Sequence, residues 1–95
     1  MRQAEQNVPE FDSLDQLDAD ILRAMREVRV FYKREGGATA AEINELVDVA
    51  RSTIGWRLNR LVDLGLAVKD DTGHATYRQT DDGERFEVLW SRTGK

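Results

Sequence analysis

Hydrophobic residues recur at three- and four-residue spacing from Leu14 onward, which is the apolar stripe of an amphipathic helix. The stripe consists of Leu14, Leu17, Ile21, Met25, Val28 and Tyr32, with Ala24 and Phe31 on one flank. Ser13, three residues before Gln16, fits a capping box, and Asp15 adds negative charge to the first turn. The pattern therefore predicts a long helix that begins after Ser13 and ends at the Gly36-Gly37 pair.

A second helix start follows this glycine pair at once. Thr39 and Glu42 have the spacing of another capping box and open a helix of about two turns, whose inward residues are Ile43, Leu46 and Val47. A third helical pattern runs over residues 51–64 with one apolar face, formed by Ile54, Leu58 and Leu61, and Gly65 supplies its stop. The pattern predicts a helix, a tight turn and a second helix.

From Leu66 the period of the pattern changes to two. Leu66, Val68, Ala75, Tyr77 and Gln79 alternate with Ala67, Lys69, Thr76 and Arg78 around the polar segment 70–74, which is typical of a β-hairpin. Thr80, followed by Asp81 and Asp82, fits the cap of a last helix with one apolar face, formed by Phe86, Leu89 and Trp90. The predicted fold is mainly α with a small β-hairpin, in the order α-α-α-β-β-α.

The chain is long enough for one domain, because its 95 residues fall near the usual size of a single domain. We expect a flexible N-terminal arm over 1–12, the domain over 13–91 and a frayed tail over 92–95. A domain this small gains stability from a partner subunit.

Composition excludes several classes of protein. There is no cysteine, so thiolate metal sites, thiol nucleophiles and disulfides are absent. No apolar run approaches the ~18 residues of a membrane span, and the N-terminus lacks the apolar segment of a signal peptide. The single histidine, His74, has no partner set for a metal site. We expect a cytoplasmic protein that is not an enzyme and uses no cofactor, metal, membrane or evident small-molecule ligand.

The formal net charge of −4 argues at first against nucleic acid as a partner. The charges are segregated, however: residues 49–62 contain the three arginines Arg51, Arg57 and Arg60 and no acid. The chain has 11 Arg against 3 Lys, and 10 of its 18 acids are Asp, a bias that resembles haloarchaeal proteins. An acidic protein from a GC-rich genome is the alternative explanation.

The order of elements resembles a winged helix-turn-helix transcription regulator, and the match covers about residues 14–90. It rests on Thr39-Ala-Ala-Glu-Ile43, Val49-Ala-Arg-Ser-Thr53-Ile54, Arg57-Leu58, Leu61, Gly65-Leu66 and Tyr77-x-x-Thr80-x-x-Gly83. With its composition, the chain looks most like the small phage-repressor-like DNA-binding proteins of haloarchaea. The resemblance implies a sequence-specific regulator of double-stranded DNA, more often a repressor that occludes a promoter, with helix 51–64 in the major groove.

The face of helix 51–64 opposite its apolar residues suits DNA chemistry. Arg can hydrogen-bond guanine at two positions and Asn can do the same for adenine, so Arg51 and Asn59 are the candidate base readers. The candidate phosphate contacts are Ser52, Thr53, Arg57 and Arg60. The hairpin offers Lys69, His74 and Arg78 to the DNA backbone or the minor groove. Asp70 and Asp71 near the hairpin's turn would repel phosphate, which weakens the prediction for the hairpin.

Trp56 points outward on this pattern, and three explanations stand. It contacts a thymine methyl or the sugar-phosphate wall, it covers the hairpin or a partner subunit, or the helix register differs and the ring is buried.

Apolar residues left over by the predicted core suggest a homodimer. These are Leu22 and Val30 of the first helix, with Phe86, Leu89 and Trp90 of the last. Packing within one chain is the alternative explanation. A two-fold dimer would present two helices to half-sites about one DNA turn apart. The competing function is a winged helix that binds another protein, with Trp56 and the C-terminal aromatic residues as anchors.

Overall fold

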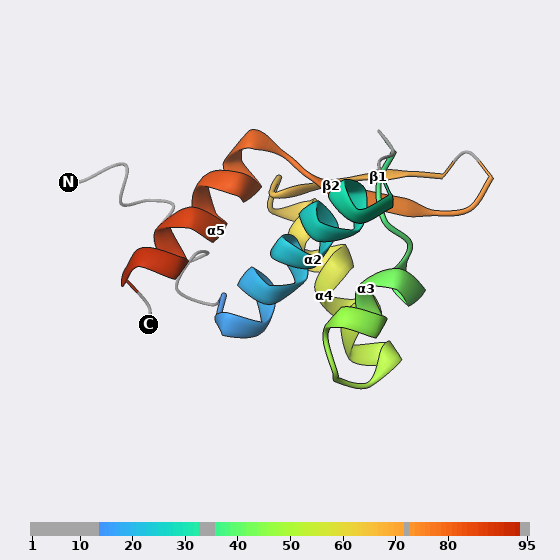
Figure 1. Cartoon of the computed structure of the whole chain (residues 1–95), viewed down its shortest axis with the longest axis horizontal. Helices are drawn as coiled ribbons and strands as arrows, with labels where there is room; N and C mark the ends of the chain where they lie inside the picture. Colours follow the sequence, from blue (N-terminus) through green and yellow to red (C-terminus); the bar gives the residue numbers. More distant parts are fainter. Residues whose placement is uncertain (1–13, 33–35, 72, 94–95) are drawn as a thin grey trace.

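The computed structural model describes residues 14–32, 36–71 and 73–93. Its elements are α2 (Gln16–Tyr32), α3 (Ala40–Leu46), α4 (Arg51–Asp63), β1 (Ala67–Asp70), β2 (Thr76–Gln79) and α5 (Asp81–Thr93) (Figure 1). In the described part of the chain this order confirms the predicted sequence of elements, α-α-α-β-β-α with one hairpin, which is consistent with a winged helix-turn-helix. The expected arm over 1–12 and the expected cap at Ser13 lie outside the described residues.

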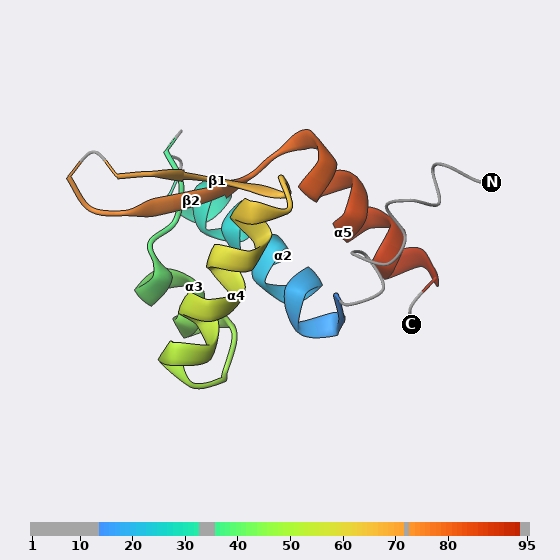
Figure 2. The ribbon, with the colours of Figure 1, turned by 180° about the vertical axis from the view of Figure 1, so that it is seen from behind.

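Helix α2 is the centre of the molecule, between α5 on one side and α3 with α4 on the other (Figures 1 and 2). Its buried face contacts α3, α4, α5 and β2. The largest fully buried apolar side chains of the core are Ile21, Leu22, Met25, Ile43, Ile54, Leu58, Leu61 and Leu66. The prediction of Leu22 as a dimer contact is therefore wrong, because this side chain is wholly enclosed in the core of its own chain. The stripe on α2 is wider than its sequence pattern indicates.

Helix α2 begins with a reciprocal cap made by two aspartates. Asp15 Oδ1 accepts hydrogen bonds from the backbone N–H groups of Leu17 and Asp18, at 3.1 and 3.3 Å. The backbone N–H of Asp15 donates to Asp18 Oδ2 at 3.0 Å. Asp15 is thus the capping residue and lies one position before the helix. The sequence had instead placed it within the first turn.

The short helix α3 has the predicted capping box. Glu42 N–H donates to Thr39 Oγ1 at 3.1 Å, and Thr39 N–H donates to Glu42 Oε1 at 2.9 Å. The side-chain amide of Asn44, in the last turn of α3, donates to the carbonyl oxygens of Val47 and Val49 beyond the helix, which fixes the turn into α4. Leu46, expected to point inward, is 54% exposed, so that expectation is wrong.

The hairpin pairs β1 with β2 in antiparallel register, with Lys69 opposite Tyr77 and Val68 opposite Arg78. The predicted phase of the first strand is wrong by one residue, since Ala67 is buried and Val68 is exposed. Ala38 adds a further bridge: its N–H and C=O each bond to the backbone of Tyr77 at 2.8 Å. The start of α3 and the hairpin are thereby tied together.

The chain leaves the hairpin through a compact junction around Thr80. Gly83 N–H donates to Thr80 Oγ1 at 3.0 Å, which confirms the predicted cap of α5, and the Thr80 hydroxyl donates to the Gly65 carbonyl at 2.8 Å. Gly65 has φ +80°, the left-handed conformation that ends α4. A Cβ on Gly83 would lie 2.1 Å from the Leu66 carbonyl oxygen, so only glycine fits there. Helix α5 then runs to Thr93, two residues into the expected tail.

No helix in the described part of the chain is long and apolar enough to cross a membrane.

Candidate nucleic-acid interface

Helix α4 separates its residues into a buried and an outward face, as predicted. Ile54, Leu58 and Leu61 are fully buried and hold the helix against the core. The exposed side chains that share its other side are Arg51, Ser52, Trp56, Asn59 and Asp63. Thr53, Gly55 and Arg60 are half-buried at the borders of this face. We call the set Arg51, Ser52, Trp56, Asn59 and Asp63, with Arg60 at its border, the outward face of α4.

The N-terminus of α4 carries no competing negative charge. Its capping residue is Ala50, which has no side-chain hydrogen bond to the helix, and the first turn contains no acid. The backbone N–H groups at the start of a helix have no intrahelical acceptor, so they suit an anion such as a phosphate. Arg51, an exposed residue in this first turn, adds a positive charge.

Trp56 lies on the outward face and is 60% exposed, so the explanation that buried the ring is wrong. Two arginines flank the indole: the Cζ of Arg60, one turn later, lies 5.3 Å from the ring centroid, and the Cζ of Arg57, the next residue, lies 5.7 Å from it. Such cation–π contacts orient the ring and keep positive charge beside it. An apolar surface and two guanidinium groups therefore occur together at the middle of α4.

Arg57 has acidic partners inside the chain. Its Nη1 donates to Asp15 Oδ1 at 2.7 Å and to Asp18 Oδ2 at 3.1 Å, and its side chain is only 18% exposed. The Asp18 carboxylate is fully buried. Arg57, expected to contact phosphate, instead joins α4 to the N-terminus of α2, and Asp15 and Asp18 offset much of its charge.

The charges of this cluster are coupled through Arg57. Burial raises the pKa of Asp18 above its usual value, although the Asp15 backbone N–H and Arg57 oppose the shift. Partial burial also raises the pKa of Asp15, but hydrogen bonds from Arg57 and from Asp18 outweigh it, and the net shift is downward. The hydrogen bond to Asp15 in turn raises the pKa of Arg57. Burial thus favours the neutral form of the Asp18 carboxyl, whereas Arg57 favours its charged form.

The hairpin presents fewer free cations than its sequence suggests. The Lys69 ammonium lies 3.6 Å from an Asp71 carboxylate oxygen and 5.9 Å from the Tyr77 ring centroid. His74 and Arg78 are exposed. The turn of the hairpin projects at the end of the molecule that also carries α3 and α4, whereas α5 lies at the other end (Figures 1 and 2).

The predicted dimer residues divide into two groups. Phe86 and Trp90 stack on each other, with ring centroids 5.7 Å apart, and Trp90 Nε1 donates to Gln16 Oε1 at 2.8 Å. Both rings are half-buried by contacts within the chain. Val30 and Leu89 are exposed, and the structure adds Val88 as a third exposed aliphatic residue.

A buried acid on α5 escaped the sequence interpretation. Glu87 is 3% exposed; its carboxylate accepts a short hydrogen bond from Arg26 and lies 3.8 Å from Arg23 Nε. The hydrogen bond to Glu87 raises the pKa of Arg26. The sequence does contain a signal for this burial. Glu87 follows Gly83 by four residues and Phe86 by one, so helical spacing places it on the inward face of α5. The cluster fixes α5 to α2.

Within the described ranges, no group of three or more His, Asp or Glu side chains forms a metal-binding arrangement.

No protein-family model matches the sequence, and no curated protein matches it either. A solved structure with a similar fold is that of BpsR from Bordetella bronchiseptica, studied for the regulation of its DNA binding by 6-hydroxynicotinic acid. It superposes with a TM-score of 0.70 at 17% identity, over 93% of this chain. The match covers 60% of that chain. The likeness establishes a shared fold.

Proposed function

We propose that this protein is a sequence-specific regulator of transcription that binds double-stranded DNA, with α4 in the major groove. The observation that carries the proposal is the outward face of α4, which combines Arg51 in an acid-free first turn with Trp56 and Asn59 in the turns that follow. A major groove about 12 Å wide admits one helix, and residues near its N-terminus reach base edges. The fold shared with a regulator whose DNA binding has been studied supports the same conclusion.

The residues of the outward face have different roles in this proposal. Arg51 and Asn59 read bases, because their side chains can form paired hydrogen bonds with guanine and adenine. Ser52, Thr53, Arg60 and the α4 N-terminus hold phosphates and set the register. Trp56 packs on a thymine methyl or the sugar-phosphate wall. Arg57 is a positioning residue, since its guanidinium orients α4 through Asp15 and Asp18.

Substitution of the base readers tests these roles. Arg51→Ala and Asn59→Ala should each weaken binding to a preferred duplex by about 1–3 kcal/mol and relax the preference at one base pair. Arg85→Ala is the matched control, because Arg85 is an exposed arginine of α5 paired with Asp82. The measurement is a set of binding isotherms over single-base variants of the preferred duplex. Unchanged affinity and preference in both variants would remove these residues from the interface.

We further propose that the protein acts as a homodimeric repressor that occludes a promoter. The exposed aliphatic residues Val88 and Leu89 of α5 and Val30 of α2 favour a second copy as their partner. A two-fold dimer places two α4 helices on half-sites one turn apart.

The acidic composition bears on the salt concentration at which the protein would bind DNA. Acid around a basic helix lowers non-specific attraction to DNA, and concentrated salt screens phosphate contacts. We propose that the protein works in concentrated salt, as a haloarchaeal regulator would, and that direct contacts from Arg51, Trp56 and Asn59 carry most of the recognition.

Protein binding is the second candidate function, favoured by the exposure of Trp56. Such a module would bind its partner through the Trp56 ring and would be insensitive to the loss of Arg51 and Arg60. The isotherms above distinguish the two functions, because only DNA recognition makes affinity depend on the base pair.

A further inference from the structure

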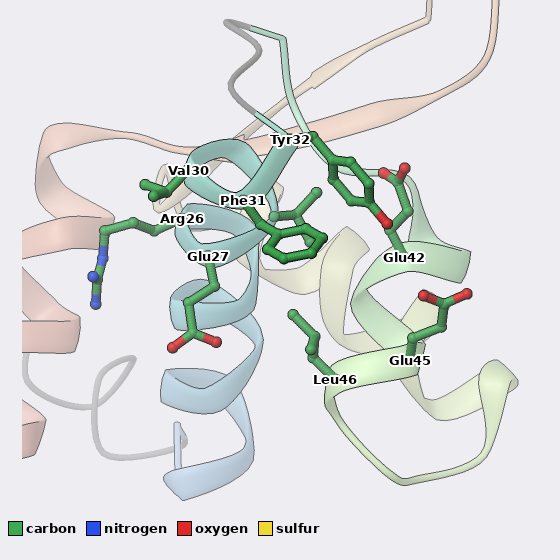
Figure 3. Close-up of a pocket in the computed structure, with 9 residues that line it drawn as sticks. Arg26, Glu27, Val30, Phe31, Tyr32, Glu42, Glu45 and Leu46 are labelled. Atoms are coloured by element: carbon green, nitrogen blue, oxygen red, sulfur yellow. The ribbon is translucent and has the colours of Figure 1, made fainter.

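A groove of about 500 Å³ lies between the C-terminal end of α2 and α3 (Figure 3). Phe31 reaches from α2 toward Leu46 of α3, and Tyr32 closes the side nearest Glu42. The volume falls within the ~300–1,000 Å³ of small-molecule sites. None of the residues predicted to contact DNA lines it, and Val30, the one predicted dimer residue in the lining, points away from Phe31 and Leu46.

The floor of this groove is formed by large apolar side chains that are exposed to solvent. Phe31 is 76% exposed, and Tyr32 and Leu46 are each more than half exposed. The Phe31 and Tyr32 rings form an edge-to-face pair with centroids 5.0 Å apart. Contiguous exposed side chains of this size mark binding sites in soluble proteins.

The rim of the groove is acidic. The Glu27 and Glu45 side chains flank the apolar floor, and neither carboxylate has a hydrogen bond or ion pair with a described residue, although the charge of Glu27 also acts on Arg26. Glu42, also in the lining, is held in the capping box of α3. The one arginine of the lining, Arg26, points toward α5, where Glu87 neutralises it. The groove therefore has carboxylates to offer and no available cation of its own among the described residues.

We propose that this groove binds a small organic cation with an apolar, aromatic-sized body. The body would contact Phe31, Tyr32 and Leu46, where aromatic faces also attract positive charge. Glu27 and Glu45 would supply the counter-charge, and they repel anions of the same shape. The proposal rests on the groove alone and does not require that the protein bind DNA.

Two ions of equal shape and opposite charge test the proposal. Tetraphenylphosphonium is titrated into the whole protein in a calorimeter, and tetraphenylborate serves as its anionic match. The phosphonium should bind saturably, one per chain, and the borate at least about tenfold more weakly. The double substitution Glu27→Gln with Glu45→Gln should weaken the phosphonium about tenfold, whereas Asp63→Asn on α4 should not.

The apolar floor has its own matched pair of variants. Leu46→Ala should weaken phosphonium binding about fivefold. Leu89→Ala should leave it unchanged, because Leu89 is equally exposed at 54% but lies on α5. Absence of phosphonium binding, equal binding of the two ions, or equal effects of Leu46→Ala and Leu89→Ala would overturn the proposal. So would a second copy that covers the groove, seen as a dimer in sedimentation that Leu46→Ala dissociates.

Discussion

Gly83→Ala should lower the free energy of unfolding by about 3 kcal/mol, a large share of the stability of so small a domain. The added Cβ would lie 2.1 Å from the Leu66 carbonyl oxygen and 3.2 Å from the Gln79 Cβ. The carbonyl also accepts a hydrogen bond from Thr80 N–H at 3.0 Å, so it cannot move away without loss of that bond. For a domain of this size the expected fall in melting temperature is about 12–24 °C.

Gly55→Ala is the control for this prediction. Gly55 lies within α4 and has no atom within 4 Å of an added Cβ, so alanine should stabilise the helix by up to about 1 kcal/mol. Thermal and urea unfolding of the two variants, followed by circular dichroism, measures both effects. Equal stability of Gly83→Ala and the native protein would mean that the contact between α5 and the Leu66 carbonyl is not as close as described.

Arg57→Ala should cost about 3 kcal/mol of stability at pH 7, because it leaves the Asp18 carboxylate buried without its cation. The loss should be smaller at acid pH. Burial raises the pKa of Asp18, so the folded state binds a proton before the unfolded state does, and the folded variant gains stability as the pH falls through that pKa. Arg57 also helps to lower the pKa of Asp15. The native protein therefore loses this stabilisation of Asp15 at acid pH, which further reduces its advantage over Arg57→Ala there.

Urea unfolding of Arg57→Ala and the native protein at pH 7 and near pH 4.5 measures this difference. Addition of Asp18→Asn to Arg57→Ala should restore part of the stability and remove most of the pH dependence. Arg85→Ala removes an exposed ion pair with Asp82 and should cost less than about 1 kcal/mol at either pH. A pH-independent loss in Arg57→Ala would show that Asp18 is not the group left without a partner.

The elements of this fold follow from local signals in the sequence. Thr39 with Glu42, Thr80 before Asp81, and Gly65 after α4 each act within four residues, and all three do in the structure what their spacing predicted. The apolar period of α4 likewise identified Ile54, Leu58 and Leu61 as its buried face. Local chemistry of this kind fixes helix ends and faces with no knowledge of the partner element.

The misjudged residues depend on partners far along the chain. Asp18 received no role in the sequence analysis, because its partner Arg57 lies 39 residues later in the chain. Leu22 fell outside a narrow stripe, but α2 is covered on several sides and buries it. Leu46 was assigned inward by its spacing, whereas α3 turns it toward the groove beside Phe31. Gly83 was part of a motif, but only the packed structure explains the glycine by its contact with Leu66.

The candidate DNA-binding residues also divide into those that local spacing placed correctly and one that depends on distant partners. Ser52, Trp56 and Asn59 were placed outward by helical period alone and Arg51 was placed in the first turn, and all four are exposed in the structure. Arg57 shares their basic segment but is joined to Asp15 and Asp18, a fact that no count of charges along the chain reveals. The net charge of residues 49–62 thus overstates the positive charge available to a phosphate backbone.

Selection of bound duplexes from a random library, at low and at molar salt, tests the proposed function most directly. If two α4 helices read DNA as a two-fold dimer, the bound pool becomes enriched in an inverted repeat with half-sites about one helical turn apart. The enrichment should persist at molar salt, where phosphate attraction is largely screened, and Arg51→Ala should abolish the preference at one position of each half-site. A pool without sequence preference at either salt concentration would contradict the assignment of this protein as a sequence-specific DNA-binding regulator.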